Sequence, residues 1–476
     1  MRRPPAIPSA SPASVPTPHA WDPDSWRSRP AAQQVRYRNE AELHTSLDKL
    51  RSLPPLVTSW EIERLRALLA EAQEGKRFLL QGGDCAESLA ECRADAITSK
   101  LKILLQMSLV LVHASKQPVI RVGRFAGQYA KPRSSPTETR TIDGQGVTLP
   151  SYFGDIVNRP PFTPQDREPD PSLLLRGYEH AALTLNFIRS LVDGGFADLH
   201  HPEYWNLGFL RHAELPADLR AQYERMCEHL ADGLRFMEAL GEARIDELTR
   251  VEFFTSHEAL LLDYESAQTR TVPRRDGWYN LSTHLPWIGE RTRQLDGAHV
   301  EYFRGIRNPI GIKLGPDCDP VELLRLVDAV SPHDEPGRLV LITRLGAKKV
   351  DHVLPRLIGV IQAARKRVLW VCDPMHANGR TTPTGIKTRH FDDILHELRR
   401  SWEIHREQGS RLGGVHFELT GDDVTECLGG ASGITEDALS TNYQSQCDPR
   451  LNYEQALEMA FLLSNLMSGT AARPAE

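Results

Sequence analysis

The sequence predicts a (β/α)8 TIM barrel of the α/β class, because eight short apolar runs alternate along its 476 residues with longer stretches of helical period. The runs are rich in β-branched and aromatic residues, which favour strands. They cover residues 78–81, 118–122, 250–254, 280–284, 309–314, 339–343, 368–372 and 415–419. An open, doubly wound sheet has the same alternation, and the number of strands alone does not exclude it.

Between these runs, apolar residues recur close to every 3.6 positions, as on one face of a helix. Ile97, Leu101, Leu104 and Leu105 follow this period within a helix predicted over 95–113. The same pattern predicts helices over 59–74, 319–330, 348–367, 391–405 and 453–467. Helices in these places would cover the outside of a barrel.

Two segments exceed what a minimal barrel needs. Residues 1–23 are rich in Pro, Ser and Ala and predict a disordered tail, followed by a helical extension over 24–75. The barrel itself is expected over 76–470. It is interrupted before its third strand by an inserted helical pair near 171–192 and 216–240, within about 171–242. Added helices commonly serve assembly or regulation.

Composition narrows the class of protein. A formal net charge of -6 provides no field that would attract nucleic acid or an anionic membrane. No apolar run approaches the roughly 18 to 20 residues of a membrane span. Seven cysteines, an odd number scattered through a long chain, indicate a reducing compartment rather than a disulfide framework. We therefore expect a cytoplasmic protein with no nucleic-acid or membrane partner.

Four residues that follow or end the apolar runs could bind a metal. They are Cys85 after the first run, His376 after the seventh, Glu418 in the eighth and Asp448 in a later loop. Barrel enzymes place their active-site loops at this end of the strands. Mixed sulfur, nitrogen and oxygen donors suit a borderline divalent ion such as manganese, cobalt, iron or zinc. Glu418 is the most informative of the four, because a carboxylate inside an apolar strand needs a partner or an ion.

A second group at the same end is cationic. Its members are Arg124, Lys131, Arg133, Arg291, Lys313 and Arg344. Several such side chains around one cavity favour a substrate with more than one anionic group. Each residue, taken alone, is as compatible with a buried thiol, a hydrogen-bonded histidine or a solvated arginine. Their shared position at one end of one barrel is what favours a site.

Around these residues the sequence resembles the class II (plant-type) 3-deoxy-D-arabino-heptulosonate 7-phosphate synthases. The motifs that carry the resemblance include GGDCAES, RVGRFAGQYAKPRSS, STHLPWIGERTRQLDGAHVEY, ITRLGAKKV, CDPMHAN and CDPRLN, in order from about Trp21 to Met467. The resemblance implies a (β/α)8 barrel that condenses phosphoenolpyruvate with erythrose 4-phosphate and water and releases phosphate. That reaction is the first step of the shikimate pathway, which leads to aromatic amino acids and related metabolites.

The resemblance also implies roles for individual residues. Cys85, His376, Glu418 and Asp448 would bind one divalent metal, usually manganese or cobalt. Two sets of substrate-binding residues follow: Arg124, Glu290, Arg291, Lys313 and Arg344 around phosphoenolpyruvate, and Lys131, Arg133 and Ser134 toward the aldose phosphate. We expect Glu290 to position or deprotonate the attacking water, and Lys313 or a metal-bound water to protonate the new alkoxide.

The sequence departs from the family in small ways, none of them at a predicted ligand or barrel-end cation. Ala377 and Gly379 stand where the family commonly has Gly and Thr, and Phe153 stands where it commonly has Arg. Members with the N-terminal extension and helical pair tend to form homodimers or homotetramers, to be inhibited by aromatic amino acids and, in some cases, to bind chorismate mutase. The resemblance implies the same kinds of partner and allosteric control here.

Two other functions and one redox hypothesis stay open. The chain could be a metal-dependent aldol-type synthase for a different aldose phosphate, or a barrel that has lost catalysis and acts as a regulatory partner. The second should have lost ligands or cations, whereas every predicted position holds a competent residue. Cys447, next to Asp448, would form a disulfide with Cys85 in the absence of metal if the two loops meet; a buried thiol without that role is the alternative.

Overall fold

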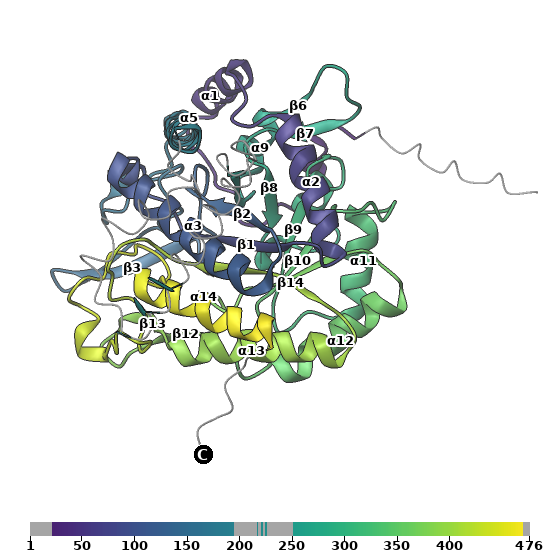
Figure 1. The fold of residues 1–476 in the computed structure, drawn as a ribbon. Helices are drawn as coiled ribbons and strands as arrows, with labels where there is room; N and C mark the ends of the chain where they lie inside the picture. The colour runs from purple at the N-terminus through teal and green to yellow at the C-terminus, as the bar shows by residue number, and fades with distance from the viewer. Residues whose placement is uncertain (1–20, 195–216, 218–219, 222–223, 226–250, 470–476) are drawn as a thin grey trace, which may run out of the picture.

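The computed structural model describes residues 21–194, 217, 220–221, 224–225 and 251–469. Eight parallel strands close into one barrel, with neighbours in the order β1, β14, β11, β10, β9, β8, β5 and β2 (Figure 1). Their bounds are β1 (Phe78–Gly83), β2 (Val119–Arg124), β5 (Phe254–Glu258), β8 (Leu285–Ile288), β9 (Ile310–Leu314), β10 (Leu339–Thr343), β11 (Leu369–Cys372) and β14 (Leu412–Glu418). The pairing of β1 with both β2 and β14 confirms the predicted barrel and excludes the open sheet.

The third and fourth barrel strands lie later in the chain than predicted, so these two predictions are wrong in position. β5 shares only Phe254 with the predicted run 250–254, and β8 begins directly after the predicted run 280–284. The last four residues of β5 are polar, so this strand has no apolar signature. Pro286 lies within β8, and proline in a run ordinarily speaks against a strand.

Helices cover the outside of the barrel. They are α3 (Ala94–Ser115), α9 (Leu262–Gln268), α10 (Ala298–Phe303), α11 (Pro320–Val330), α12 (Val350–Ala363), α13 (Phe391–Glu407) and α14 (Tyr453–Ser468). α3 and α11 to α14 confirm the predicted helices, with ends that differ by a few residues. α11 begins as its sequence indicates: the Asp319 carboxylate accepts the N–H groups of Val321 and Glu322, and Pro320 occupies the first helical position.

Among the described helices, α3 is long and apolar enough to cross a membrane, yet 72% of its most apolar window is buried. It packs along α14. Leu101, Leu104 and Leu105 are buried there in the same cluster as Leu457 and Leu463 of α14. α3 therefore has the burial of a core helix.

α2 (Ser59–Gln73) closes the N-terminal end of the barrel. Thr58 and Glu61 form the capping box that starts this helix. Leu65, Leu68 and Leu69 of α2 then pack against apolar residues that point into the barrel. These are Leu79, Ile120, Val122, Phe254, Leu285, Val340, Ile342, Leu369 and Val371. The floor of the barrel is thus apolar and covered, and polar side chains inside the barrel are confined to the levels above it.

The chain is attached to the barrel from Trp21 onward. Residues 1–20 of the predicted tail (1–23) lie outside the described residues. Trp21 Nε1 donates a hydrogen bond to the Glu301 carbonyl at 2.9 Å, and the buried Trp26 donates to Ser266 Oγ at 2.7 Å. The last residues of the predicted tail are therefore packed against the barrel helices.

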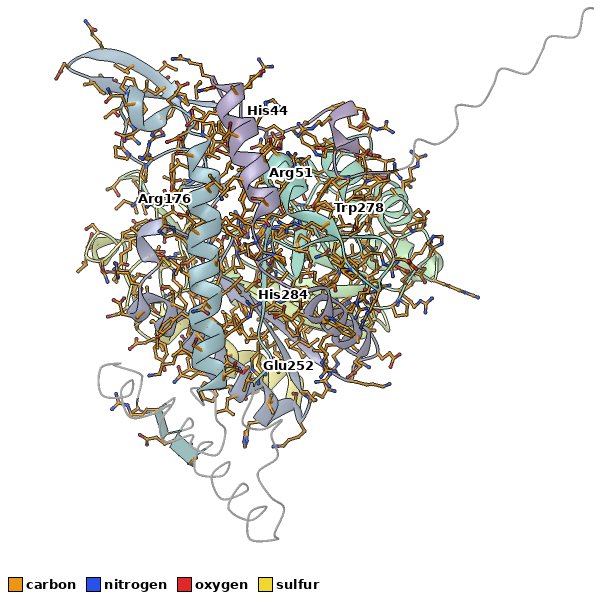
Figure 2. All side chains as sticks on the ribbon, turned by 90° about the horizontal axis from the view of Figure 1, so that it is seen from above. His44, Arg51, Arg176, Glu252, Trp278 and His284 are labelled. Carbon is orange, nitrogen blue, oxygen red and sulfur yellow. The ribbon has the colours of Figure 1, made fainter. Side chains whose placement is uncertain are left out.

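The segments added to the barrel lie together in part. Helix α1 (Glu40–Ser52), within the predicted extension, runs beside α5 (Ser172–Asp193), the first inserted helix; Figure 2 marks α1 by His44 and Arg51 and α5 by Arg176. The second inserted helix, predicted over 216–240, falls almost entirely outside the described residues. The remaining short elements are η1 (Ser25–Ser28), η2 (Leu89–Glu91), β3 (Thr137–Ile142), β4 (Gln145–Pro150), α4 (Pro164–Arg167), β6 (Thr269–Thr271), β7 (Trp278–Asn280), η3 (Glu290–Thr292), β12 (Gly379–Thr381), β13 (Lys387–Arg389) and η4 (Glu436–Ala438).

Truncation of a buried leucine of α2, at the apolar end of the barrel, should destabilise the fold. Leu69 is 0% exposed, so Leu69→Ala removes apolar contacts and leaves a cavity, which typically lowers the free energy of unfolding by about 2–5 kcal/mol. Urea unfolding measures the change. Leu183→Ala, at a side chain that is 60% exposed, is the control and should change stability by less than about 0.5 kcal/mol. Equal stability of the two variants would contradict the packing described for α2.

Candidate metal and substrate site

The side chains inside the barrel change character along its axis. Successive residues of a strand point to opposite faces, so alternate residues line the interior. Above the apolar floor, Gln81 donates a hydrogen bond to Ser256 across the barrel at 2.9 Å. At the C-terminal ends of the strands the interior residues are charged: Arg124 in β2, Lys313 in β9 and Glu418 in β14 are all buried. A charged layer therefore lies at the end of the barrel opposite the floor.

Three of the four predicted metal ligands, Cys85, Glu418 and Asp448, lie together in this layer, and the fourth, His376, contacts Glu418. The ligating atoms of Cys85, Glu418 and Asp448 all lie within 4.8 Å of one another. Cys85 Sγ is 3.6 Å from Asp448 Oδ2, and His376 Nε2 is 2.9 Å from Glu418 Oε1. Two ligands bound to one ion by bonds of about 2.0–2.3 Å lie no more than roughly 4.6 Å apart. The cluster needs only a small contraction to hold an ion.

Of the four predicted ligands, Glu418 is the one that most requires a cation. Its side chain is 0% exposed, and neither oxygen accepts a hydrogen bond of good geometry from the described part of the chain. Burial would raise the pKa of this carboxyl, but His376 and Arg389 outweigh burial and hold the pKa well below its usual value. An ionised, buried carboxylate with unused lone pairs, beside a thiol, an imidazole and a second carboxylate, fits a divalent ion.

Asp373, which directly follows β11, orients His376. The Nδ1 atom of His376 is 2.7 Å from Asp373 Oδ2, so that Nε2 is directed to Glu418. A carboxylate behind a ligating histidine fixes the tautomer that binds the metal. Lys313 contacts the same Asp373 oxygen. Burial would raise the pKa of Asp373, but His376 and Lys313 hold it well below its usual value.

Lys131 lies among the metal ligands. Its ammonium donates to Cys85 Sγ at 3.2 Å and to Asp448 Oδ2 at 3.0 Å. The Cys85 thiol is also hydrogen-bonded to Cys447, and this contact and burial raise the pKa of Cys85. The same contact, together with Lys131, lowers the pKa of Cys447 to about 7. Cys447 is therefore the more acidic thiol of the pair.

A chain of buried ion pairs joins the two metal-binding loops. Asp84, next to Cys85, lies 2.5 Å from Lys100 and 2.6 Å from Arg450. Arg450, two residues after Asp448, is in turn 2.9 Å from Glu426. Sequence reasoning missed this connection, because Asp84 and Arg450 are 366 residues apart and nothing in the sequence pairs them.

Three of the predicted cations gather beside the metal ligands. The Arg124 guanidinium and the Lys313 ammonium lie 5.3 Å and 5.8 Å from the ring centroid of Trp287. Arg344 Nη2 donates to the His376 carbonyl at 2.9 Å. Burial lowers the pKa of Lys313, and the nearby charge of Arg124 lowers it further, against the effect of Asp373. Cations held this close together favour an anionic ligand.

Glu258, at the end of β5, is a site residue that sequence reasoning missed. Burial raises the pKa of its carboxyl, while Lys313, His376 and Arg124 oppose the rise. Its Oε1 is buried and accepts no hydrogen bond from the described residues. A Cβ at Gly289 would overlap this carboxylate where it now lies, so the backbone of Gly289 packs closely against Glu258. The sequence could have indicated Glu258 if the third strand had been predicted four residues later, because Glu258 would then have stood at the inward-facing end of that strand.

The remaining predicted residues lie toward the rim of the site. Glu290 Oε2 accepts the Gly315 N–H at 2.5 Å, and its Oε1 is 3.1 Å from Arg293, which ties Glu290 to the loop after β9. Arg291 and Ser134 are exposed and Arg133 is partly exposed. No contact between the side chains of these three residues and the four metal ligands is found among the described residues. Arg291 is nevertheless near enough to Glu258 to lower the pKa of that carboxyl.

The arrangement has two chemical capacities. One is to hold a divalent ion through mixed donors, and the other is to bind anionic groups through buried cations directly beside that ion. A small substrate with phosphate or carboxylate groups could thus be held with a carbonyl oxygen at the ion.

The chain is similar to known proteins along most of its length. The sequence profile described as the class-II DAHP synthetase family matches residues 21–464. A phospho-2-dehydro-3-deoxyheptonate aldolase of Neurospora crassa is 50% identical, covering 94% of this chain and 95% of the relative. Proteins of that name from Streptomyces coelicolor (49% identical; 93% and 96% covered) and Mycolicibacterium smegmatis (AroG, 45% identical; 93% and 94% covered) are also similar. The chain therefore belongs to the class-II DAHP synthetase family.

Proposed function

We propose that the charged end of the barrel is the active site at which the chain carries out the reaction of its family. The chain condenses phosphoenolpyruvate with erythrose 4-phosphate and water to give 3-deoxy-D-arabino-heptulosonate 7-phosphate and phosphate, the first step of the shikimate pathway. One observation carries the assignment of the site: Arg124, a buried cation suited to a substrate anion, lies 3.3 Å from the buried carboxylate of Glu418.

The family depends on a metal, and we assign its binding to Cys85, His376, Glu418 and Asp448. Manganese or cobalt is the proposed ion, with zinc and iron as alternatives, because a thiolate among imidazole and carboxylate donors suits borderline ions. When bound there, the ion supplies Lewis-acid polarisation of the aldehyde of erythrose 4-phosphate.

The buried cations position the first substrate. Arg124, Lys313 and Arg344, with Arg291 nearer the rim, are proposed to bind the phosphate and carboxylate of phosphoenolpyruvate. Carbon 3 then faces the aldehyde and attacks it, and positive charge develops at carbon 2. Water adds at carbon 2 and phosphate leaves. Orientation and electrostatic stabilisation are the main contributions of these side chains. Lys131, Arg133 and Ser134 are proposed to serve the aldose phosphate.

Two carboxyl groups are candidates for positioning the attacking water. Glu290 is the candidate from the sequence, but its oxygens are already used by Gly315 and Arg293. Glu258 has a buried oxygen without a partner among the described residues, and burial raises its pKa, which favours a role in proton transfer. We therefore propose Glu258 as the residue that orients the water and Glu290 as a support of the loop. Lys313, whose pKa is lowered, is the proposed donor to the new alkoxide.

Removal of the thiolate ligand should abolish activity together with metal binding. Cys85→Ala is expected to lower kcat by more than about a hundredfold and to lose bound metal after chelation and reloading. Product formation and metal analysis are measured on one preparation, with manganese, cobalt, zinc or iron in turn. Cys92→Ala, at a thiol bonded to Thr184 away from the cluster, is the control. Near-normal turnover by Cys85→Ala with metal still bound would contradict the ligand assignment.

The two carboxyl groups can be separated by matched amide variants. Glu258→Gln should lower kcat by about 10²–10⁴-fold with a small change in the KM for phosphoenolpyruvate, as expected for loss of a proton-transfer group. Glu290→Gln should lower kcat less. A pH profile of kcat/KM accompanies both variants. The opposite order of effects would return the role to Glu290.

The contact between Cys85 and Cys447 supports the disulfide hypothesis. Metal-free protein exposed to mild oxidant should lose two free thiols, since the two sulfur atoms are already in hydrogen-bonding contact. Metal-loaded wild-type protein and the Cys447→Ala variant should keep all of their free thiols under the same oxidant. An unchanged thiol count in the metal-free wild type would favour the alternative of a simple buried thiol.

The added helices α1 and α5 are the basis for proposing partners other than the substrates. They are not needed to close the barrel, and such helices suit subunit contact or regulation. We therefore propose a homodimer or homotetramer under allosteric control by aromatic amino acids, with chorismate mutase as a further partner. A cytoplasmic location is proposed from the six described cysteines, all of which are free. Sedimentation velocity, with and without phenylalanine, tyrosine and tryptophan, tests the assembly.

A further inference from the structure

A cavity of about 230 Å³ lies at the end of the barrel opposite the active site. It is enclosed by the segment after α2, the first residues of β1 and β14, and the C-terminal ends of α13 and α14, two helices that Figure 1 shows side by side. Phe78 and Leu412 line the cavity at the start of β1 and β14, whereas Glu418 is at the far end of β14. A strand of this length spans roughly 20 Å, so the cavity is separate from the charged layer.

The lining of the cavity is cationic. It contains Arg77, Arg406 and Arg411 and no acidic residue. Arg77 is paired with Glu71 at 2.5 Å, but within the described ranges no ion pair joins Arg406 or Arg411 to a carboxylate. This concentration of unpaired guanidinium groups favours an anionic ligand.

The position of Arg411 is built into the backbone. Gly75 has a φ of 76°, which side chains rarely adopt, and a Cβ at this residue would overlap the Arg411 guanidinium. The turn after α2 therefore favours glycine, and the guanidinium of Arg411 lies directly against this residue.

Most of the other side chains that line the cavity are apolar, and the rings of Trp402 and His405 each carry a buried nitrogen atom. Phe78, Trp402, Leu412 and Met467 supply the apolar surface. Trp402 Nε1 and His405 Nε2 are buried and have no hydrogen-bond partner among the described residues. His405 is 1% exposed, and its other ring nitrogen is 3.0 Å from Ser410 Oγ. Because both atoms are shielded from solvent, neither faces the free space of the cavity, and the arginines are the donors that a ligand there can reach.

The volume of the cavity limits the size of the ligand. An engineered cavity of about 150 Å³ is large enough for benzene, so about 230 Å³ accommodates one ring with a short charged substituent. We propose that this cavity is a second ligand site, which binds a small organic carboxylate with an apolar ring as its body. The carboxylate accepts hydrogen bonds from the arginines, and the ring packs on Phe78 and Met467.

The test uses the full chain, loaded with metal and saturated with phosphoenolpyruvate so that the active-site cations are occupied. Calorimetric titration with phenylacetate should give saturable binding of one molecule per chain. Arg411→Gln should weaken that binding by roughly tenfold or more through loss of a charge-assisted pair, and Arg406→Gln should weaken it for the same reason. Arg399→Gln, at an exposed arginine of α13 that does not line the cavity, is the matched control and should bind as the wild type does.

Unchanged kcat of Arg411→Gln and Arg406→Gln confirms that both variants are folded and that the effect is separate from catalysis. The proposal is overturned by an absence of saturable binding at millimolar phenylacetate, or by equal affinity of Arg411→Gln, Arg406→Gln and wild type. Inorganic phosphate, titrated in the same way, should bind more weakly because it has no apolar body. Tighter binding of phosphate than of phenylacetate would overturn the assigned ligand class.

Discussion

The structure depends on the mutual compensation of charges that are buried at one end of a barrel. Isolated ions in such a place are strongly destabilised, and they persist only where opposite charges and hydrogen bonds surround them. Glu418 is held between Arg389, Arg124 and His376, and Asp373 between His376 and Lys313. The exception is the side of Glu418 that faces Cys85 and Asp448, where acidic donors meet. That imbalance is what a divalent ion would correct, with Lys131 bridging Cys85 and Asp448 in its absence.

The fold tolerates this charged layer because the layer is confined to one end of the barrel. α2 seals the other end of the barrel with leucines, and the alternation of strand residues confines the charges to the level above the Gln81–Ser256 contact. The ion pairs of Asp84, Lys100, Arg450 and Glu426 then connect the loops that carry Cys85 and Asp448. The metal ligands come from distant parts of the chain, yet each is attached to a strand end or to this buried network. Rigid attachment of that kind is what a preorganised site requires.

Much of this was predictable from sequence, for physical reasons. The strands with continuous apolar runs were found, and with them Lys313 and Glu418, because a charge at the end of an apolar strand has few structural explanations. β5 and β8 were misplaced because most residues of β5 are polar and β8 contains a proline, and Glu258 was lost with β5. Arg389 and the Asp84–Arg450 pair could not be found, since long-range ion pairs leave no periodic trace in a sequence. Lys131 was found, but its contact with the metal ligands depends on how two loops fold together.

The central claim is that one divalent ion is bound by a thiolate, an imidazole and two carboxylates at the charged end of the barrel. X-ray absorption at the metal edge of the cobalt-loaded protein tests it most directly. We expect one sulfur neighbour at about 2.3 Å together with nitrogen and oxygen neighbours at about 2.0–2.2 Å, and loss of the sulfur signal in Cys85→Ser. A coordination shell of oxygen and nitrogen alone in the wild-type protein, at full occupancy and full activity, would contradict the account.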